Sequence, residues 1–161
     1  MGHYDLSGKT VLVTGAEVGI GRAIAMRALA DGANVAIAGI NKEMREETVS
    51  LVRDAGFVER FVALSADIRD AGQVQKMVDD TVAKFCHLDA VVANAGVMVV
   101  RRPFLELTHE EWHNVIAVNL HGTFHTLQAA TRVLKSQGRG GDLFVTTSSN
   151  AVRPSPMASA Y

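Results

Sequence analysis

The chain has 161 residues, enough for one domain that buries roughly 70% of its unfolded surface. Its 16 basic and 17 acidic residues nearly balance, so the charge indicates neither a nucleic-acid partner nor an anionic membrane. Cys86 is the only cysteine, and no apolar run approaches the ~20 residues of a membrane span. These features exclude an internal disulfide and predict a cytoplasmic protein.

The first half of the chain alternates short apolar runs with helical patterns. The runs lack polar alternation and predict buried strands at residues 10–13, 34–38 and 61–64. Apolar residues at helical spacing predict helices at residues 20–31 and 42–55, each with a glycine where it ends.

The same alternation continues in the second half. Apolar runs predict two further strands, at residues 89–93 and 143–147. Asp70 is expected to cap one helix. Thr108, with a glutamate three residues later, is expected to begin a longer helix that bends near Gly122.

Strands that alternate with helices form right-handed βαβ units, which place the strands in a parallel sheet. We therefore expect an α/β fold with a doubly wound, Rossmann-like sheet between two helical layers, as a single dinucleotide-binding domain over residues 1–161. In such a sheet, ligands bind at the carboxyl ends of the strands.

A glycine-rich turn joins the first strand to the first helix. Its glycines are Gly15, Gly19 and Gly21. Glycines let the backbone approach a ligand closely, and a helix N-terminus offers unpaired N–H groups to an anion. The turn predicts a site for a pyrophosphate.

Polar residues follow the later strands. Asp67 comes after the third strand, Asn94 after the fourth and Ser148 after the fifth. Each also has a purely local interpretation, because Asp, Asn and Ser are common in turns. Asn119 is unusual inside a predicted helix, which favours either a functional role or a bend.

Taken together, these motifs resemble the short-chain dehydrogenase/reductase family over the whole chain. The matching features are the Thr-Gly-x-x-x-Gly-x-Gly signature from Thr14 to Gly21, Asp67, Asn94-Ala95-Gly96, Asn119, Ser148 and Tyr161. The resemblance implies an NAD(P) cofactor. The residues expected to bind it are Gly15, Glu17, Gly19, Ile20, Gly21, Asp67, Ile68, Asn94, Ala95 and Gly96.

The resemblance also implies hydride transfer between the nicotinamide and a small alcohol or carbonyl substrate. Tyr161 would be the general acid/base, Ser148 would hold the substrate oxygen and Asn119 would support a water relay. Ser149 competes with Ser148 for the serine role. The resemblance further implies a homodimer or homotetramer for a full-length member, with no expected membrane or nucleic-acid partner.

One part of the family pattern is missing. The family's tyrosine belongs to a Tyr-x-x-x-Lys motif, and this sequence ends at Tyr161. Members also continue into further strands and helices, so we expect a fragment that does not turn over by itself. The alternative is an inactive dinucleotide-binding homologue that acts as a sensor or scaffold.

The choice between NAD and NADP is left open, with a slight preference for NAD. NAD-preferring members carry an acid at the end of the second strand, where this chain has Gly39. The arginine typical of NADP-preferring members is replaced by Ile40. Glu17 would repel a 2′-phosphate if it pointed that way, whereas Lys42 would attract one.

A second motif, His109-Glu110-Glu111-Trp112-His113, matches the zinc-binding pattern His-Glu-x-x-His. It falls in the first turn of a predicted helix, and positions 116 and 119 hold Ile and Asn instead of the Gly and His of the extended zinc motif. We therefore predict no metal site.

Overall fold

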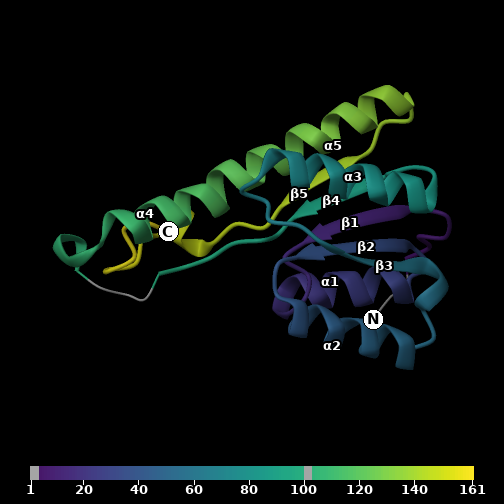
Figure 1. The fold of residues 1–161 in the computed structure, drawn as a ribbon, viewed down its shortest axis with the longest axis horizontal. Helices are drawn as coiled ribbons and strands as arrows, with labels where there is room; N and C mark the ends of the chain where they lie inside the picture. The colour runs from purple at the N-terminus through teal and green to yellow at the C-terminus, as the bar shows by residue number, and fades with distance from the viewer. Residues whose placement is uncertain (1–3, 100–102) are drawn as a thin grey trace.

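The computed structural model describes residues 4–99 and 103–161 and shows five parallel strands in one sheet (Figure 1). The strands lie in the order β3-β2-β1-β4-β5. Their bounds are β1 Thr10–Thr14, β2 Asn34–Gly39, β3 Phe61–Ser65, β4 Ala90–Ala93 and β5 Asp142–Val145. All five predicted strands are present, with small shifts at their ends.

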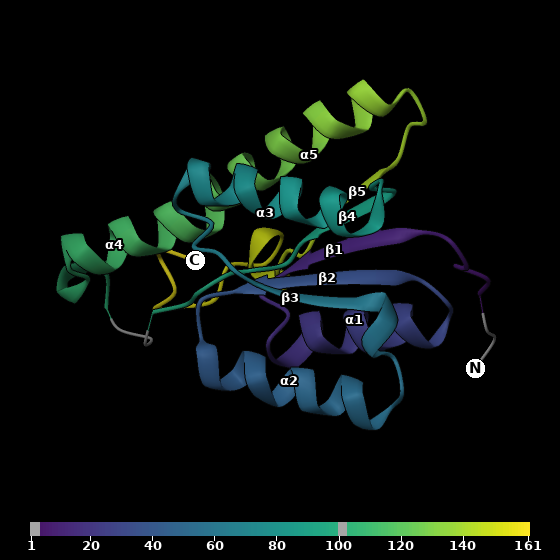
Figure 2. The same cartoon turned by 45° about the vertical axis from the view of Figure 1, so that its right-hand side comes forward.

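Helices cover both faces of the sheet, which confirms the doubly wound, three-layer fold (Figure 2). On one face lie α1 (Gly19–Ala30) and α2 (Lys42–Asp54), and on the other lie α3 (Ala71–Phe85) and α5 (Thr123–Gln137). Short 3₁₀ turns occur at η1 Val58–Arg60, η2 Phe104–Glu106 and η4 Ser149–Ala151. The strand order reverses between β1 and β4, which is where such a sheet opens a ligand crevice.

β1 divides its side chains between two apolar clusters, one under each helical layer. Leu12 packs with residues of α3 and α5. Val11 and Val13 pack with residues of α1 and α2. All five residues of β1 are buried, as expected for a parallel strand covered on both faces.

The predicted helix starts are confirmed. The Asp70 carboxylate accepts hydrogen bonds from the backbone N–H groups of Gly72 and Gln73, at 2.8 and 3.1 Å. Thr108 and Glu111 form the predicted capping box at the start of α4 (His109–Val115). These caps satisfy N–H groups that have no partner within the helix itself.

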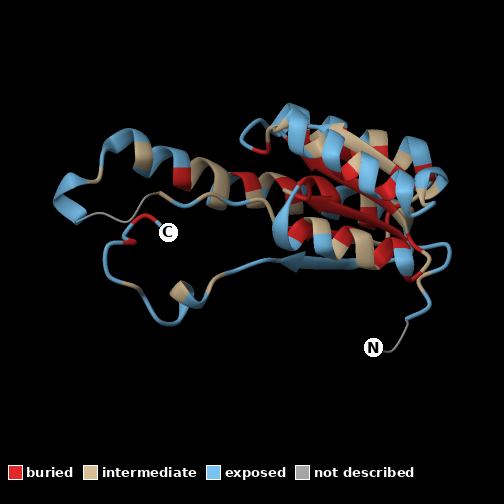
Figure 3. Cartoon of the chain, turned by 90° about the horizontal axis from the view of Figure 1, so that it is seen from below, coloured by how far each residue is buried: buried red, intermediate tan, exposed pale blue. Residues whose placement is uncertain are grey.

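The bend near Gly122 stays a prediction. The structure has a π-helical segment there, η3 (Ile116–Gly122), between α4 and α5. We call residues 109–122 the arm, because Figure 3 shows this part of the helix projecting beyond the sheet; half of its residues are exposed. At the base of the arm, a Cβ on residue 122 would lie 2.5 Å from Ile68 Cδ1, so only glycine allows this close packing.

β5 differs from the other strands in its burial. All four of its residues are exposed, including Leu143 and Phe144, although the strand pairs with β4 in parallel register. It lies at the edge of the sheet, along the lower side of Figure 3. Of the helices that the structure describes, none is long and apolar enough to cross a membrane.

Candidate cofactor and active site

A cleft of about 780 Å³ opens at the carboxyl ends of the strands and extends to the arm. Most of the predicted site residues line it together. They are Gly15, Glu17, Ile20, Asp67, Ile68, Asn94, Ala95, Gly96, Asn119, Ser148 and Tyr161. Of the predicted set, Gly19 and Gly21 do not line the cleft; they shape the turn behind it.

Two glycines of the turn are required by crowding. A Cβ on Gly15 would lie 2.6 Å from Ala95 Cα, and the positive φ of 62° at Gly15 is also unfavourable for other residues. A Cβ on Gly21 would lie 2.5 Å from both Asn94 Nδ2 and Gly15 O. The turn therefore packs directly against the residues that follow β4.

The N-terminus of α1 is open, unlike those of α2, α3 and α4. Val18, its N-cap residue, makes no side-chain hydrogen bond, and the first turn contains no acidic residue. By contrast, Asn41 caps α2, Asp70 caps α3 and Thr108 caps α4. The glycine turn and these free N–H groups fit a pyrophosphate at the mouth of the cleft.

Asn94 holds this turn in place. Its Nδ2 donates to the carbonyl oxygens of Thr14 and Gly15, at 3.0 and 3.1 Å. The Thr146 hydroxyl donates to Asn94 Oδ1 at 3.0 Å, and the Thr14 hydroxyl accepts from the backbone N–H groups of Asn94 and Ala95. Thr14 is the first residue of the family signature, but its contacts and that of Thr146 were not predicted, because they join residues far apart in the chain.

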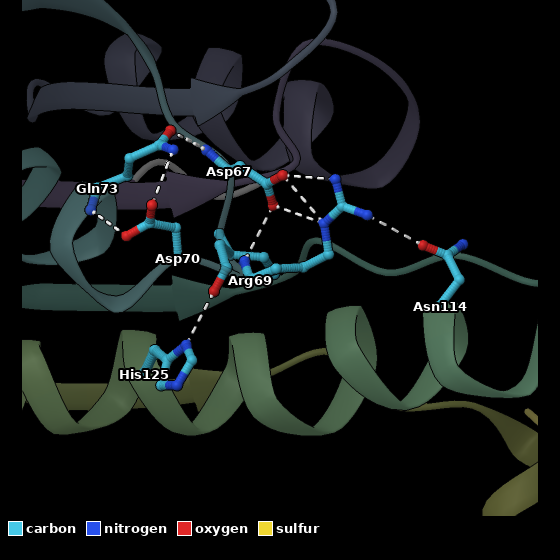
Figure 4. Close-up of polar contacts among 7 residues, drawn as sticks. Asp67, Arg69, Asp70, Gln73, Asn114 and His125 are labelled. Carbon is cyan, nitrogen blue, oxygen red and sulfur yellow. Dashed lines mark hydrogen bonds and ion pairs between the residues drawn. The ribbon is translucent and has the colours of Figure 1, made fainter. Parts of the chain in front are cut away.

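Asp67 is part of a polar network beside the cleft (Figure 4). Its carboxylate accepts three hydrogen bonds from the Arg69 side chain, at 2.6 to 3.0 Å, and Arg69 also donates to Asn114 Oδ1 at 3.3 Å. The side-chain hydrogen bonds from Arg69 hold the pKa of the Asp67 carboxyl below its ordinary value. Asp67 was predicted from the sequence, whereas Arg69 and Asn114 were not.

His125 and Gln73 complete this network. His125 Nδ1 lies 3.1 Å from the carbonyl oxygen of Ile68, and the Gln73 side chain accepts a 3.0 Å hydrogen bond from the backbone N–H of Asp67 (Figure 4). Both contacts fix the backbone after β3. Asp67 and Ile68 are thereby held at the edge of the cleft.

Glu17 lies across the end of β2. It is only 7% exposed, and a Cβ on Gly39 would overlap its carboxylate group. The backbone carbonyl of Glu17 accepts hydrogen bonds from Arg22 Nη2 at 2.6 Å and from the Thr48 hydroxyl at 2.9 Å. Its carboxylate therefore occupies the space that a side chain at position 39 would need.

Asn119 joins the arm to the segment that follows β4. Its Oδ1 accepts from the backbone N–H of Val97 at 2.8 Å, and its Nδ2 donates to the carbonyl of Val97 at 2.9 Å. The π-helical segment that carries Asn119 is a common feature of functional sites. Both polar atoms of this side chain are thus engaged in positioning the wall of the cleft.

Ser148 and Ser149 lie differently. Ser148 is partly buried and lines the cleft, and its Oγ accepts a 3.2 Å hydrogen bond from the backbone N–H of Asn150. Ser149 is exposed and is not among the residues that line the cleft. Tyr161 is 44% exposed and lines the same cleft as Ser148.

The His-Glu-x-x-His motif lies in α4. The His113 ring contacts the backbone carbonyl of His109, with 2.6 Å between Nδ1 and the oxygen. Glu111 belongs to the capping box. Within the part of the chain that the structure describes, no group of three His, Cys, Asp or Glu side chains could hold a metal ion.

Comparison with known proteins extends these observations. The profile of the short chain dehydrogenase family matches residues 9–161. A short chain dehydrogenase/reductase of Macrophomina phaseolina, dpmpG, is 36% identical over 149 residues, covering 92% of this chain and 85% of that protein. The L-rhamnose 1-dehydrogenase (NAD(P)(+)) of Azotobacter vinelandii is 37% identical over 155 residues, covering 95% and 60%.

A solved structure gives the same result. The crystal structure of a short chain dehydrogenase/reductase from Burkholderia phymatum, in complex with NAD, matches with a TM-score of 0.92 at 25% identity. The match covers 98% of this chain and 55% of that protein. Among the curated relatives, the chain spans 59% of a Mycobacterium tuberculosis oxidoreductase. With the glycine turn, the ordered motifs and the fold in agreement, the chain belongs to the short-chain dehydrogenase family.

Proposed function

We propose that the protein containing this chain transfers a hydride between a nicotinamide cofactor and a small alcohol or carbonyl substrate. The observation that carries this proposal is a single cleft lined both by the glycine turn and by Ser148 and Tyr161. A dinucleotide held on the turn and a substrate held at these two hydroxyls would meet in the same space. When bound, the cofactor supplies the redox chemistry.

In this proposal, different residues bind the cofactor, hold the substrate and transfer the proton. The turn at Gly15 and the open end of α1 bind the pyrophosphate, while Asp67 and Ile68 border the adenine side. Ser148 donates a hydrogen bond to the substrate oxygen. The Tyr161 hydroxyl gives a proton to that oxygen during carbonyl reduction and takes it back during alcohol oxidation.

Asn119 acts as a positioning residue in this scheme. Its amide oxygen and nitrogen both hydrogen-bond the Val97 backbone, so its effect passes through the wall of the cleft. The water relay implied by the family resemblance would then rest on backbone groups that Asn119 keeps in place.

The decisive experiment uses the full-length protein, NAD(H) and NADP(H), and a panel of small alcohols and carbonyl compounds. We expect Tyr161→Phe to reduce turnover by about 10²–10⁴-fold while NADH binding, followed by its fluorescence, stays intact. Ser148→Ala should also reduce turnover. Ser149→Ala is the matched control and should leave turnover unchanged.

Two outcomes would contradict the proposal. Equal turnover by wild type and Tyr161→Phe would remove Tyr161 from the chemistry. NADH binding by a wild-type protein that turns over none of the panel would favour the inactive dinucleotide-binding alternative.

We also propose that the full-length protein forms a homodimer or homotetramer. The arm and the start of α5 expose large apolar side chains, namely Trp112, Leu120 and Phe124. Light scattering during size-exclusion chromatography tests this, and a monomer at micromolar concentration would refute it. The cytoplasmic location and the absence of a nucleic-acid partner stay predictions from composition.

A further inference from the structure

We propose that Glu17 recognises the adenosine ribose of the cofactor and makes the site select a dinucleotide without a 2′-phosphate. This inference rests on the proposed cofactor site and names the residue that determines its specificity. An acid that binds the ribose 2′-hydroxyl is expected after β2 in a dinucleotide fold. Here that position is Gly39, and the carboxylate comes from the glycine turn instead.

The Glu17 carboxylate lies where a side chain at position 39 would begin. The Glu17 carboxylate lies so close to Gly39 that any Cβ at that position would overlap it. An acidic side chain growing from residue 39 would have to begin in the same space. Glu17, Gly39 and Ile40 all line the cleft, so the carboxylate stands at the ribose end of the cofactor site.

One oxygen of the Glu17 carboxylate lacks a hydrogen-bond donor among the described residues. Glu17 Oε2 is fully buried and has no hydrogen-bond partner among residues 4–99 and 103–161. Oε1 accepts only a long 3.4 Å contact from the backbone N–H of Asn41. A buried carboxylate oxygen without a donor is unfavourable, and a rotation that turns Oε2 toward the cleft would let ribose hydroxyls supply the missing donors.

The backbone that carries this carboxylate is held by several hydrogen bonds. The Glu17 carbonyl is held by Arg22 Nη2 and Nε, at 2.6 and 3.1 Å, and by the Thr48 hydroxyl. Arg22 is itself paired with Glu47 at 2.9 Å. The backbone that carries the carboxylate is therefore fixed from two helices, which favours a preformed binding group.

Positively charged side chains that could pair with a 2′-phosphate are scarce among the described residues that line the cleft. A 2′-phosphate would need a positively charged partner, but Arg69 is the only Lys or Arg among the described residues that line the cleft, and it is paired with Asp67. Arg45 lies near the end of β2, and its Nη1 donates to the Gly39 carbonyl at 2.9 Å. Lys42 is well exposed and lies 3.8 Å from Glu46. At the ribose end of the cleft, the charged side chain among the described lining residues is therefore Glu17, while Arg22 and Arg45 are engaged with backbone carbonyls.

The experiment uses the full-length protein and ligands that lack the nicotinamide. Binding of ADP-ribose, its 2′-deoxy analogue and its 2′-phosphorylated analogue is measured by calorimetry for wild type, Glu17→Gln and Glu46→Gln. We expect wild type to prefer ADP-ribose to both analogues by about tenfold or more, the size of one lost charge-assisted hydrogen bond. Glu17→Gln should lose most of both preferences.

Glu46→Gln is the matched control. It removes one exposed carboxylate from α2, outside the cleft, and should keep the wild-type preferences. An unchanged preference in Glu17→Gln would overturn the inference. If Glu17→Gln does not fold, the wild type alone decides, because equal binding of ADP-ribose and its 2′-deoxy analogue would overturn it as well. Failure of folded wild type to bind either NADH or ADP-ribose would instead refute the proposed function.

Discussion

The centre of the sheet and its β5 edge differ in how completely the chain covers them. Every residue of β1 is buried between helical layers, whereas every residue of β5 is exposed. The same contrast separates the two halves of the cleft. The cofactor half rests on the buried strands. By contrast, half of the arm and most of the segment that carries Ser148 and Tyr161 are exposed (Figure 3).

This difference suggests that the dinucleotide half of the site is largely organised by contacts within these residues. The glycine turn is held by Asn94 and by the crowding at Gly15. The substrate half has fewer such contacts. Variants placed in matched pairs, one in each region, can test this contrast.

The largest expected effect is on stability. Leu12→Ala in β1 should lower the free energy of unfolding by about 2–5 kcal/mol, because it leaves a cavity in a fully buried core. Leu143→Ala in β5 should cost less than about 1 kcal/mol, since that side chain is 41% exposed. Denaturant titration compares them, and similar losses would show that β5 is covered in solution.

A second pair concerns two glycines with positive φ. Gly15→Ala should cost about 3 kcal/mol, from the left-handed backbone and the clash with Ala95, and should abolish NADH binding. Gly138→Ala, at the end of α5, has a φ of 65° but no atom within 4 Å of the new Cβ. It should cost about 1 kcal/mol and leave NADH binding unchanged. Equal binding losses would argue against the role of crowding at the turn.

A third pair compares Asn94 with Asn119. Asn94→Ala strips hydrogen bonds from the glycine turn, so it should cost about 1–3 kcal/mol and weaken NADH binding. Asn119→Ala leaves the backbone of Val97 unpaired and should lower kcat at nearly unchanged NADH affinity. Fluorescence titration and steady-state kinetics separate these effects. A large loss of NADH affinity in Asn119→Ala would mean that the two halves are coupled.

The smallest expected effect is the pH dependence of the Asp67–Arg69 pair. Because Arg69 lowers the pKa of Asp67 in the folded state, the pair stabilises the protein above the unfolded pKa of ~3.9, and this contribution is lost as pH falls through the folded pKa. Arg69→Ala should cost less than about 1 kcal/mol at pH 7, since the pair is partly exposed.

The measurement for this pair is the free energy of unfolding as a function of pH. The difference between wild type and Arg69→Ala should shrink as the pH falls below about 4. Arg53→Ala, an exposed arginine of α2, is the control and should show no such convergence. A constant difference across this range would place the effect of Arg69 outside its pairing with Asp67.

Several features were predictable because their causes are local. The strands follow from apolar runs, the start of α3 from Asp70 and the capping box from Thr108 and Glu111. Most of the residues that the family resemblance singled out also line one cleft. In each case the signal lies within a few positions of the residue that it concerns.

Other features depend on residues that are distant in sequence. No local pattern predicts that the Asn94 amide binds the backbone of Gly15, or that Arg69 reaches Asn114 on the arm. The π-helical segment at Ile116–Gly122 was not predicted, and its backbone widening depends on packing against other elements as well as on its own residues.

The sequence by itself therefore determined the family, the parallel fold and the residue types expected at the site. Periodicity and motif spacing, on which these depend, are properties of neighbouring residues. Only the tertiary structure decided what those residues contact. Glu17 shows this most clearly. Its carboxylate can lie against the end of β2 only because residue 39 is a glycine and has no side chain. Chain topology creates that proximity, and linear spacing does not encode it.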